Sequence, residues 1–295
     1  MKPDVFAAVM ATGIVSIAAA DHGYRLVSDV LVVLAAVALP VLIVMVARAW
    51  RGFDFRDPDV ALGLCTYVAA CAVVGARLTE YRVVVLVLGG MALQGWLSLA
   101  PLVARRMWGD RGGLPDRAHG GWELASVATS GLAIVSADLD IVFLALMFWA
   151  LAICVYLLMT SLILWRAARD PSAPELVRPD VWILMGGVAV MTLAGDHIRQ
   201  AGIEWIRPAT VVTWVVATVW IPPLIYIALR RRIGLAWAAV FPLGMYSSAT
   251  YASAVETGWP ALRSISMLFC WIALAAWTVV AFVGVARVSA SRSRA

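Results

Sequence analysis

The sequence predicts an all-α membrane protein, and three observations support this class: the composition, the length of the apolar runs and the placement of the arginines. Hydrophobic residues fill 63% of the 295 positions, charged residues fill 14%, and the mean hydropathy is +0.90. A soluble domain has about a quarter charged residues, so lipid is the solvent that fits this chain. Apolar runs such as 30–47 and 141–164 are as long as helices and do not alternate strictly, which favours helices over a membrane barrel.

Ten apolar segments have the length of a transmembrane helix. A hydrocarbon core of about 30 Å is crossed by roughly 20 helical residues, and the links between the segments are mostly short, so consecutive helices should pair as antiparallel hairpins. We predict one transmembrane domain over residues 1–295, without a separate soluble domain. The predicted spans are 3–20, 28–47, 59–78, 82–104, 122–137, 141–166, 180–198, 209–229, 235–254 and 262–286.

The basic residues predict the orientation of these spans. Seventeen of them lie at the two termini and in the links after the even-numbered spans, whereas six lie on the other side. Because basic residues concentrate on the cytoplasmic side, both termini are predicted to be cytoplasmic, in a plasma (inner) membrane. The arginines lie in short links between spans, so they indicate topology and not a nucleic-acid partner.

Several kinds of chemistry are excluded by residues that the chain lacks. Lys2 is the only lysine, so no Schiff base forms inside the membrane. The three histidines, His22, His119 and His197, lie near helix ends or in a link, which argues against bis-histidine haem ligation. The sequence shows no phosphate-binding loop, no HExxH and no GxSxG, and its four cysteines lack metal-like spacing. We therefore expect no enzyme activity, no cofactor and no metal site.

The odd-numbered and even-numbered spans differ in composition. Odd spans are rich in small and hydroxyl residues, as in AAVMATGIVSIAAA and ELASVATSGLAIVSA, whereas even spans such as LVVLAAVALPVLIVMV are bulky. Small residues let helices approach closely, and hydroxyls either bond across helices or face water. Two interpretations remain open: the odd helices are the packed centre of a bundle, or they line a central pore with the even helices outside.

Charged residues near the ends of odd spans are candidates for a titrating group or for the mouth of a pore, because charge inside a membrane is costly. Glu123 lies at the start of span 122–137, and Asp196 and Arg199 lie at the outer end of span 180–198. The alternative interpretation is that these groups anchor helix ends, with Asp196 and Arg199 forming a local pair.

Span 235–254 contains the stretch WAAVFPLGMY, in which Phe241 precedes Pro242 and Gly244. Pro242 cannot donate a hydrogen bond to the carbonyl of Ala238, so we expect the helix to kink or open there. An aromatic ring beside a kink on a helix of small residues suggests a plug, although a buried phenylalanine is more often packing.

Three passages make the chain resemble the tellurite-resistance/C4-dicarboxylate transporter family, which includes slow-type anion channels, malate carriers and sulfite efflux proteins. They are FAAVMATGIVS from Phe6, WELASVATSGLAIV from Trp122 and WAAVFPLGMYSSAT from Trp237. The resemblance implies five hairpins around a central pore, a homotrimer with one pore in each subunit, and a pore closed by a phenylalanine at the position of Phe241. Ser130-Gly131 stands where relatives often have a glutamine–serine pair.

From these observations we expect passive transport of small anions, such as chloride, nitrate, sulfite or malate, through a neutral pore gated by Phe241. The alternative is a proton-coupled carrier of C4-dicarboxylates, which needs a titrating group such as Glu123 or Asp196. A membrane sensor or scaffold is a third interpretation, against which the absence of a soluble output domain argues. The expected lining residues are Thr12, Gly13, Ser16, Thr66, Ser126, Ser130, Thr192, Gly244, Met245 and Ser248.

Overall fold

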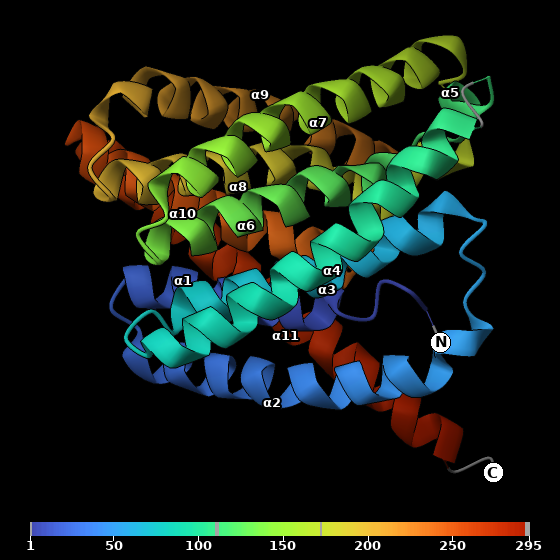
Figure 1. Ribbon diagram of the computed structural model, residues 1–295, viewed down its shortest axis with the longest axis horizontal. Helices are drawn as coiled ribbons and strands as arrows, with labels where there is room; N and C mark the ends of the chain where they lie inside the picture. Colours follow the sequence, from blue (N-terminus) through green and yellow to red (C-terminus); the bar gives the residue numbers. More distant parts are fainter. Residues whose placement is uncertain (1, 110–111, 172, 293–295) are drawn as a thin grey trace.

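The computed structural model describes residues 2–109, 112–171 and 173–292, and within these residues the regular secondary structure is entirely helical (Figure 1). The all-α class is confirmed. Arg111 and Arg294, two of the basic residues used to predict the orientation, lie outside the described residues. The helices of 15 residues or more are α1 (Ala7–Asp21), α2 (Arg25–Ala49), α3 (Pro58–Arg77), α4 (Arg82–Gly109), α6 (Leu124–Asp138), α7 (Val142–Arg169), α8 (Ile183–Gln200), α9 (Arg207–Arg231), α10 (Trp237–Thr257) and α11 (Pro260–Arg292).

Five of these helices form a closed ring. In the ring α1 contacts α3, α3 contacts α6, α6 contacts α8, α8 contacts α10, and α10 returns to α1. These are the helices of the odd-numbered predicted spans, and we call them the inner helices. Each packs against the helix that follows it in the long-helix series, namely α2, α4, α7, α9 or α11, which we call the outer helices. The start of α1 and the end of α11 lie toward the same end of the molecule (Figure 1).

Burial distinguishes the inner helices from the outer ones. In the most apolar 18-residue stretch of α3 and of α8, 78% and 89% of the residues are buried, compared with 11% to 33% in the five outer helices. The outer helices expose leucine, valine and tryptophan side chains that suit lipid. Among the described residues, seven helices are long and apolar enough to cross a membrane by length and composition, and α1, α6 and α10 are not among them. Those three are inner helices, which the outer helices shield from lipid.

Glycines explain why the five inner helices approach so closely. A Cβ atom at Gly13 would lie 2.8 Å from Val73 of α3, and one at Gly131 would lie 2.8 Å from Ala72 of α3. The same holds at the other three seams, where the added atom would lie 3.1 Å or less from the neighbouring inner helix. These contacts are Gly187 to Ser126, Gly186 to Pro242 and Gly244 to Ile14. Every seam of the ring therefore has a glycine, as expected where helix backbones pack closely in lipid.

Hydroxyl groups on the inner helices bond mainly to the outer helices. The indole N–H groups of three tryptophans on outer helices each donate to a threonine of an inner helix, at 2.8 to 3.1 Å. These pairs are Trp96 with Thr129, Trp214 with Thr250 and Trp277 with Thr12. Interhelical hydrogen bonds of this kind contribute about 0.6 kcal/mol each in membranes, so the polar residues of the inner helices help to hold the two layers together.

The helix boundaries differ from the predicted spans by a few residues. The first inner helix begins at Ala7, because the preceding residues form a turn, and α10 begins at Trp237. Residues 120–123 and 179–182 form 3₁₀ turns that lead into α6 and α8. Outer helices are longer than predicted, as α4 continues to Gly109 and α11 to Arg292. The predicted spans were limited to roughly the 20 residues that cross the hydrocarbon core, whereas these outer helices continue beyond that length.

Candidate functional site

A small apolar cavity, which we call the neck, lies where all five inner helices meet. Its volume is about 10 Å³, close to the minimum that holds one water molecule. None of its lining side chains is charged or bears a hydroxyl, so nothing in it would compensate an ion for its lost hydration. The lining residues are Ile17, Ala69, Ala72, Val73, Ala76, Val127, Gly131, Ile134, Val190, Leu193, Phe241 and Met245.

Phe241 lies at this neck and is completely buried. It is the fifth residue of α10, about 6 Å along the helix axis from Trp237. The neck is nevertheless lined by residues near the middle of other inner helices, such as Gly131 of α6 and Val190 of α8. The depth of Phe241 counted along its own helix therefore understates its depth within the ring. The helix α10 does not open at Pro242, whose ring lies against Gly186 of α8.

The two glycines and the methionine that were predicted to line a pore lie at different places in the ring. Met245 lies at the neck, one helical turn after Phe241. Gly13 lies at the seam between α1 and α3, and Gly244 lies at the seam between α10 and α1. Both glycines permit close packing of the ring.

The hydroxyls of Thr12, Ser16 and Thr192 point to outer helices. Thr12 accepts the indole N–H of Trp277 at 2.8 Å, and Thr192 donates to Thr213 of α9 at 2.9 Å. Ser16 donates to the carbonyl oxygen of Ser28 on α2 at 2.8 Å. These side chains join the inner helices to the outer ones, as expected if the odd-numbered spans form the packed centre of a bundle.

Of the remaining hydroxyls predicted to line a pore, that of Ser130 on α6 is buried without a hydrogen-bond partner among the described residues. The hydroxyl of Ser248 on α10 is also buried, and it interacts with the carboxylate of Asp21 at the end of α1. By contrast, the hydroxyl of Thr66 donates to the carbonyl oxygen of Gly63 at 2.6 Å, and the hydroxyl of Ser126 contacts Glu123. An unpaired buried hydroxyl is costly and calls for a ligand or water, so Ser130 is the predicted lining hydroxyl that has no partner among the described residues.

Charged groups from several inner helices lie close together at the end of the ring opposite the predicted cytoplasmic end, which we call the outer end. Asp138, the last residue of α6, lies 2.6 Å from Nδ1 of His197 on α8. Asp21, the last residue of α1, interacts electrostatically with His197 and with Arg77, the last residue of α3. The sequence did not single out Asp21 and Asp138, because each resembles an ordinary helix-end residue. Their position directly after a span of small residues is the one feature that could have marked them as part of a cluster.

Asp196 and Arg199, which were predicted as mouth residues, form the local pair of the alternative interpretation. Their side chains lie 2.9 Å apart, and Arg199 also lies 3.6 Å from Glu204. Gln200 donates a second hydrogen bond to Asp196 at 2.6 Å. The charge of Arg199 is thus largely compensated by carboxylates, which reduces its ability to attract anions from solution.

Glu123 is fully buried between α6 and α7. Its carboxylate accepts hydrogen bonds from Thr160 at 2.6 Å and from Ser126 at 2.8 Å. Among the described residues no basic side chain forms an ion pair with it. It faces an outer helix and is absent from the lining of the neck.

A histidine and two carboxylates join three segments at the predicted cytoplasmic end. His119, in the link before α6, places Nδ1 2.8 Å from Asp180 and Nε2 3.5 Å from Asp59 of α3. The indole N–H of Trp122 donates to the other oxygen of Asp59 at 2.8 Å. Burial disfavours the charged imidazole, but the two carboxylates outweigh this effect and raise the pKa of His119 to about 9.

We predict that this cluster makes stability depend on pH. Because folding raises the pKa of His119 from 6.5 to about 9, its contribution is fully present below pH 6.5 and is lost as the pH rises through 9. The contribution reaches up to about 3 kcal/mol. The wild-type protein should therefore lose thermal stability between pH 6.5 and 9, and His119→Gln should flatten this decline. Equal declines in the two proteins would contradict the assignment.

The inner helices all begin at the same end of the ring, because each is followed by an outer helix that returns the chain to that end. Each helix N-terminus has a partial positive charge of about half a unit. The N-terminal ends of all five inner helices therefore lie at the predicted cytoplasmic end of the ring, where the carboxylates of Asp59 and Asp180 also lie. Among the described residues no group of three or more histidine, cysteine or acidic side chains is placed to hold a metal ion.

Comparisons with known proteins identify the family. The model of a family described as the voltage-dependent anion channel matches residues 1–285. Two relatives, described as uncharacterized membrane proteins of Mycobacterium tuberculosis strains CDC 1551 / Oshkosh and H37Rv, are each 30% identical over 143 residues. That match covers 42% of this chain and 72% of each relative. Members of the matched family are channels or transporters that move anions across membranes. The resemblance found in the sequence is thus confirmed, and the chain belongs to the voltage-dependent anion channel family.

Proposed function

We propose that this chain is a passive channel for small anions, with its pathway along the axis of the inner ring and its gate at Phe241. The single observation that best supports this function is the neck, to which all five inner helices contribute and where the fully buried ring of Phe241 leaves about 10 Å³. So narrow an apolar constriction blocks ions, since hydrophobic constrictions close pores by excluding water. The conformation described is therefore the closed one.

Opening requires the Phe241 ring to leave the axis. Four small residues of the neck, Ala69, Ala72, Ala76 and Gly131, lie among bulkier ones, and a rotamer change that moves the Phe241 ring away from them would widen the passage. We assign the hydroxyl of Ser130, which has no partner among the described residues, to the lining of the pathway, where it would replace part of the hydration shell of an anion. Weak, neutral coordination of this kind allows an ion to leave quickly, as conduction requires.

The alternative function is a proton-coupled carrier for C4-dicarboxylates. It is favoured by one observation, the cluster of Asp21, Asp138 and His197 at the outer end of the ring, because such groups can exchange protons. Glu123 is a weaker candidate for the titrating group, because it faces an outer helix.

Flux into liposomes distinguishes the channel from the carrier. Purified protein is reconstituted, and chloride, nitrate, sulfite and malate uptake is measured under an imposed voltage and, separately, under a proton gradient. The channel predicts uptake that follows the voltage, shows no saturation at millimolar anion and does not need the proton gradient. Saturable malate uptake that requires the proton gradient would overturn the channel in favour of the carrier.

We predict that the carboxylate of Asp21 slows anion passage at the outer end of the ring. It lies at the end of α1 and interacts electrostatically with groups on two other inner helices, His197 and Arg77, so we place its charge beside the proposed pathway. Removing it should lower the barrier by about 1 kcal/mol, which is about a fivefold gain in flux. Asp21→Asn should show this gain when it is combined with Phe241→Ala. Glu80→Gln, which removes an exposed carboxylate from the link between α3 and α4, is the control, and equal effects of the two variants would contradict the prediction.

The proposal extends to the assembly and location of the protein. The family resemblance supports a homotrimer with one pore in each subunit, and the seventeen basic residues on one side support a plasma (inner) membrane with cytoplasmic termini. The whole chain then acts as one transmembrane domain, whose partners are the lipid bilayer and the transported anion.

A further inference from the structure

Among the residues that the structure describes, four of the grooves that open toward lipid lie between outer helices. They lie between α2 and α11, between α2 and α4, between α4 and α7, and between α7 and α9. Each is mainly apolar, and each has residues of an inner helix in its lining. Grooves of this kind arise because five outer helices do not fully cover five inner ones.

The groove between α7 and α9 is the one of these four whose lining includes charged residues. Arg230 and Arg231, the last two residues of α9, line its predicted cytoplasmic end. The linings of the other three described grooves contain no charged side chain. The positive-inside rule explains why arginines lie at this end of a helix, but it does not explain why they line a groove here and not elsewhere.

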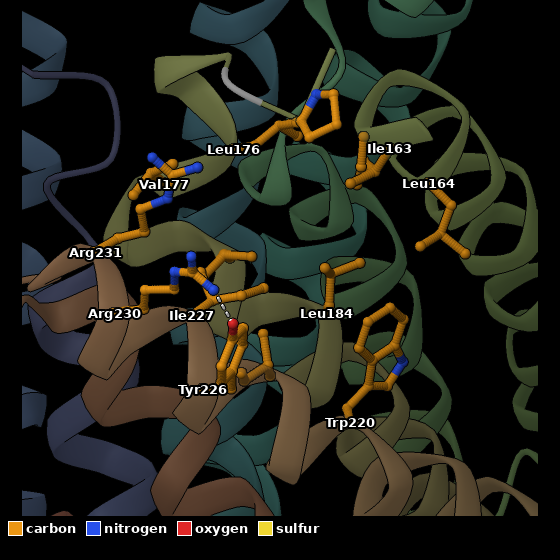
Figure 2. Close-up of a pocket in the computed structure, with 14 residues that line it drawn as sticks. Ile163, Leu164, Leu176, Val177, Leu184, Trp220, Tyr226, Ile227, Arg230 and Arg231 are labelled. Carbon is orange, nitrogen blue, oxygen red and sulfur yellow. Dashed lines mark hydrogen bonds between the residues drawn. The ribbon is translucent and has the colours of Figure 1, made fainter. Parts of the chain in front are cut away.

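The two arginines have no carboxylate partner among the described residues. The guanidinium of Arg230 donates to the hydroxyl of Tyr226 and lies 5.7 Å from the centre of its ring (Figure 2). Arg231 forms no ion pair with a described residue, and both arginines are exposed. Glu175, in the nearby link between α7 and α8, is already paired with Arg166 at 2.6 Å. Two positive charges are therefore available at one end of this apolar groove.

The rest of this groove is apolar and suits a hydrocarbon chain. Its volume is about 510 Å³, and its walls include Ile163 of α7 and Trp220 and Ile227 of α9. Leu184, on the inner helix α8, also lines it. In Figure 2 the arginines lie at one side of the group of lining residues, and Ile163, Leu164 and Trp220 lie at the other.

We propose that this groove binds one anionic glycerophospholipid, with its phosphate between Arg230 and Arg231 and an acyl chain along the apolar walls. Charge complementarity selects this occupant, since basic pockets between helices on the cytoplasmic side bind anionic headgroups. A free anion would leave the apolar walls unused, and a zwitterionic lipid would leave the pair of positive charges uncompensated. The site is separate from the neck and does not depend on the transport mechanism.

Native mass spectrometry of the purified protein, titrated with dioleoyl phosphatidylglycerol, tests this site. Wild-type protein should retain one phosphatidylglycerol more tightly than phosphatidylcholine with the same chains. Arg230→Gln/Arg231→Gln should bind phosphatidylglycerol at least about tenfold more weakly, because each arginine near an anionic lipid contributes about a factor of five. Arg48→Gln/Arg51→Gln removes two exposed arginines, one from the predicted cytoplasmic end of α2 and one from the turn that follows it, and should leave the binding unchanged.

Four outcomes would overturn the proposal. Equal weakening in both double variants would show that only the general surface charge attracts the lipid. Displacement of the lipid by soluble glycerol phosphate at similar concentration, or unchanged binding in Ile227→Trp, which fills the groove, would show that the acyl chain is not bound there. A change in oligomer mass of the Arg230→Gln/Arg231→Gln protein, with lipid binding intact, would show that a second copy of the chain covers the groove.

Discussion

Replacing Phe241 by alanine is expected to raise voltage-driven anion flux by at least about tenfold, because it removes the ring that closes the neck and thus about 1.4 kcal/mol or more of barrier. A phenylalanine that only packs a core would behave differently. Its replacement by alanine would cost about 3–5 kcal/mol of stability and give no flux. On the proposed pathway water would fill the space that the ring leaves, so we expect the folded protein to be retained. The measurement is chloride flux into liposomes at matched protein content.

A matched control for Phe241→Ala is Phe143→Ala. Phe143 lies on the outer helix α7 and is 81% exposed, so it faces lipid and not the axis. It should leave the flux at the wild-type level. Flux in well-folded Phe241→Ala protein equal to that of Phe143→Ala would remove Phe241 from the gate.

Replacing Gly120 by alanine is expected to give the largest loss of stability. The added Cβ atom would lie 2.4 Å from the carbonyl oxygen of Asp180 and 2.6 Å from the Cα atom of Val181. Both are backbone atoms, so no rotamer change relieves the contact, and the segments around His119 must separate. We expect a loss of about 3 kcal/mol or more, measured as a fall in the midpoint of thermal unfolding in detergent.

The control for Gly120→Ala is Gly90→Ala on the outer helix α4. Gly90 is exposed, and a Cβ atom there would meet nothing within 4 Å. Because alanine favours a helix over glycine by about 1 kcal/mol, this variant should be as stable as the wild type or more so. Similar losses in the two variants would contradict the close packing at Gly120.

The composition of the spans predicted the inner and outer helices because the two environments demand different residues. Glycines such as Gly13 and Gly131 lie at seams where no side chain fits, and lipid-facing helices need bulky apolar surfaces such as Phe143. Both demands act on single residues and are therefore visible in a sequence. Phe241 was singled out by its neighbours and by the family resemblance, and it lies at the neck; its role as the gate is our proposal.

The direction of each hydroxyl was not predictable from the sequence. Within each turn, an inner helix faces two neighbouring inner helices, one outer helix and the axis of the ring. The side chain of a threonine such as Thr12 could therefore point toward any of them. Its partner Trp277 lies far along the chain on α11. The outer cluster of Asp21, Asp138 and His197 was hidden for the same reason, because it forms only where the ends of separate helices converge.

The position of the gate is tested most directly by the reactivity of a cysteine placed at Met245, which lies at the neck beside Phe241. The variant Met245→Cys is made in a protein whose four cysteines are replaced by alanine, and a negatively charged methanethiosulfonate is applied from the predicted cytoplasmic side. With Phe241 present the reaction should be slow, and with Phe241→Ala it should be at least about tenfold faster. Equal rates in the two proteins would contradict a pathway along the ring axis that is closed by Phe241.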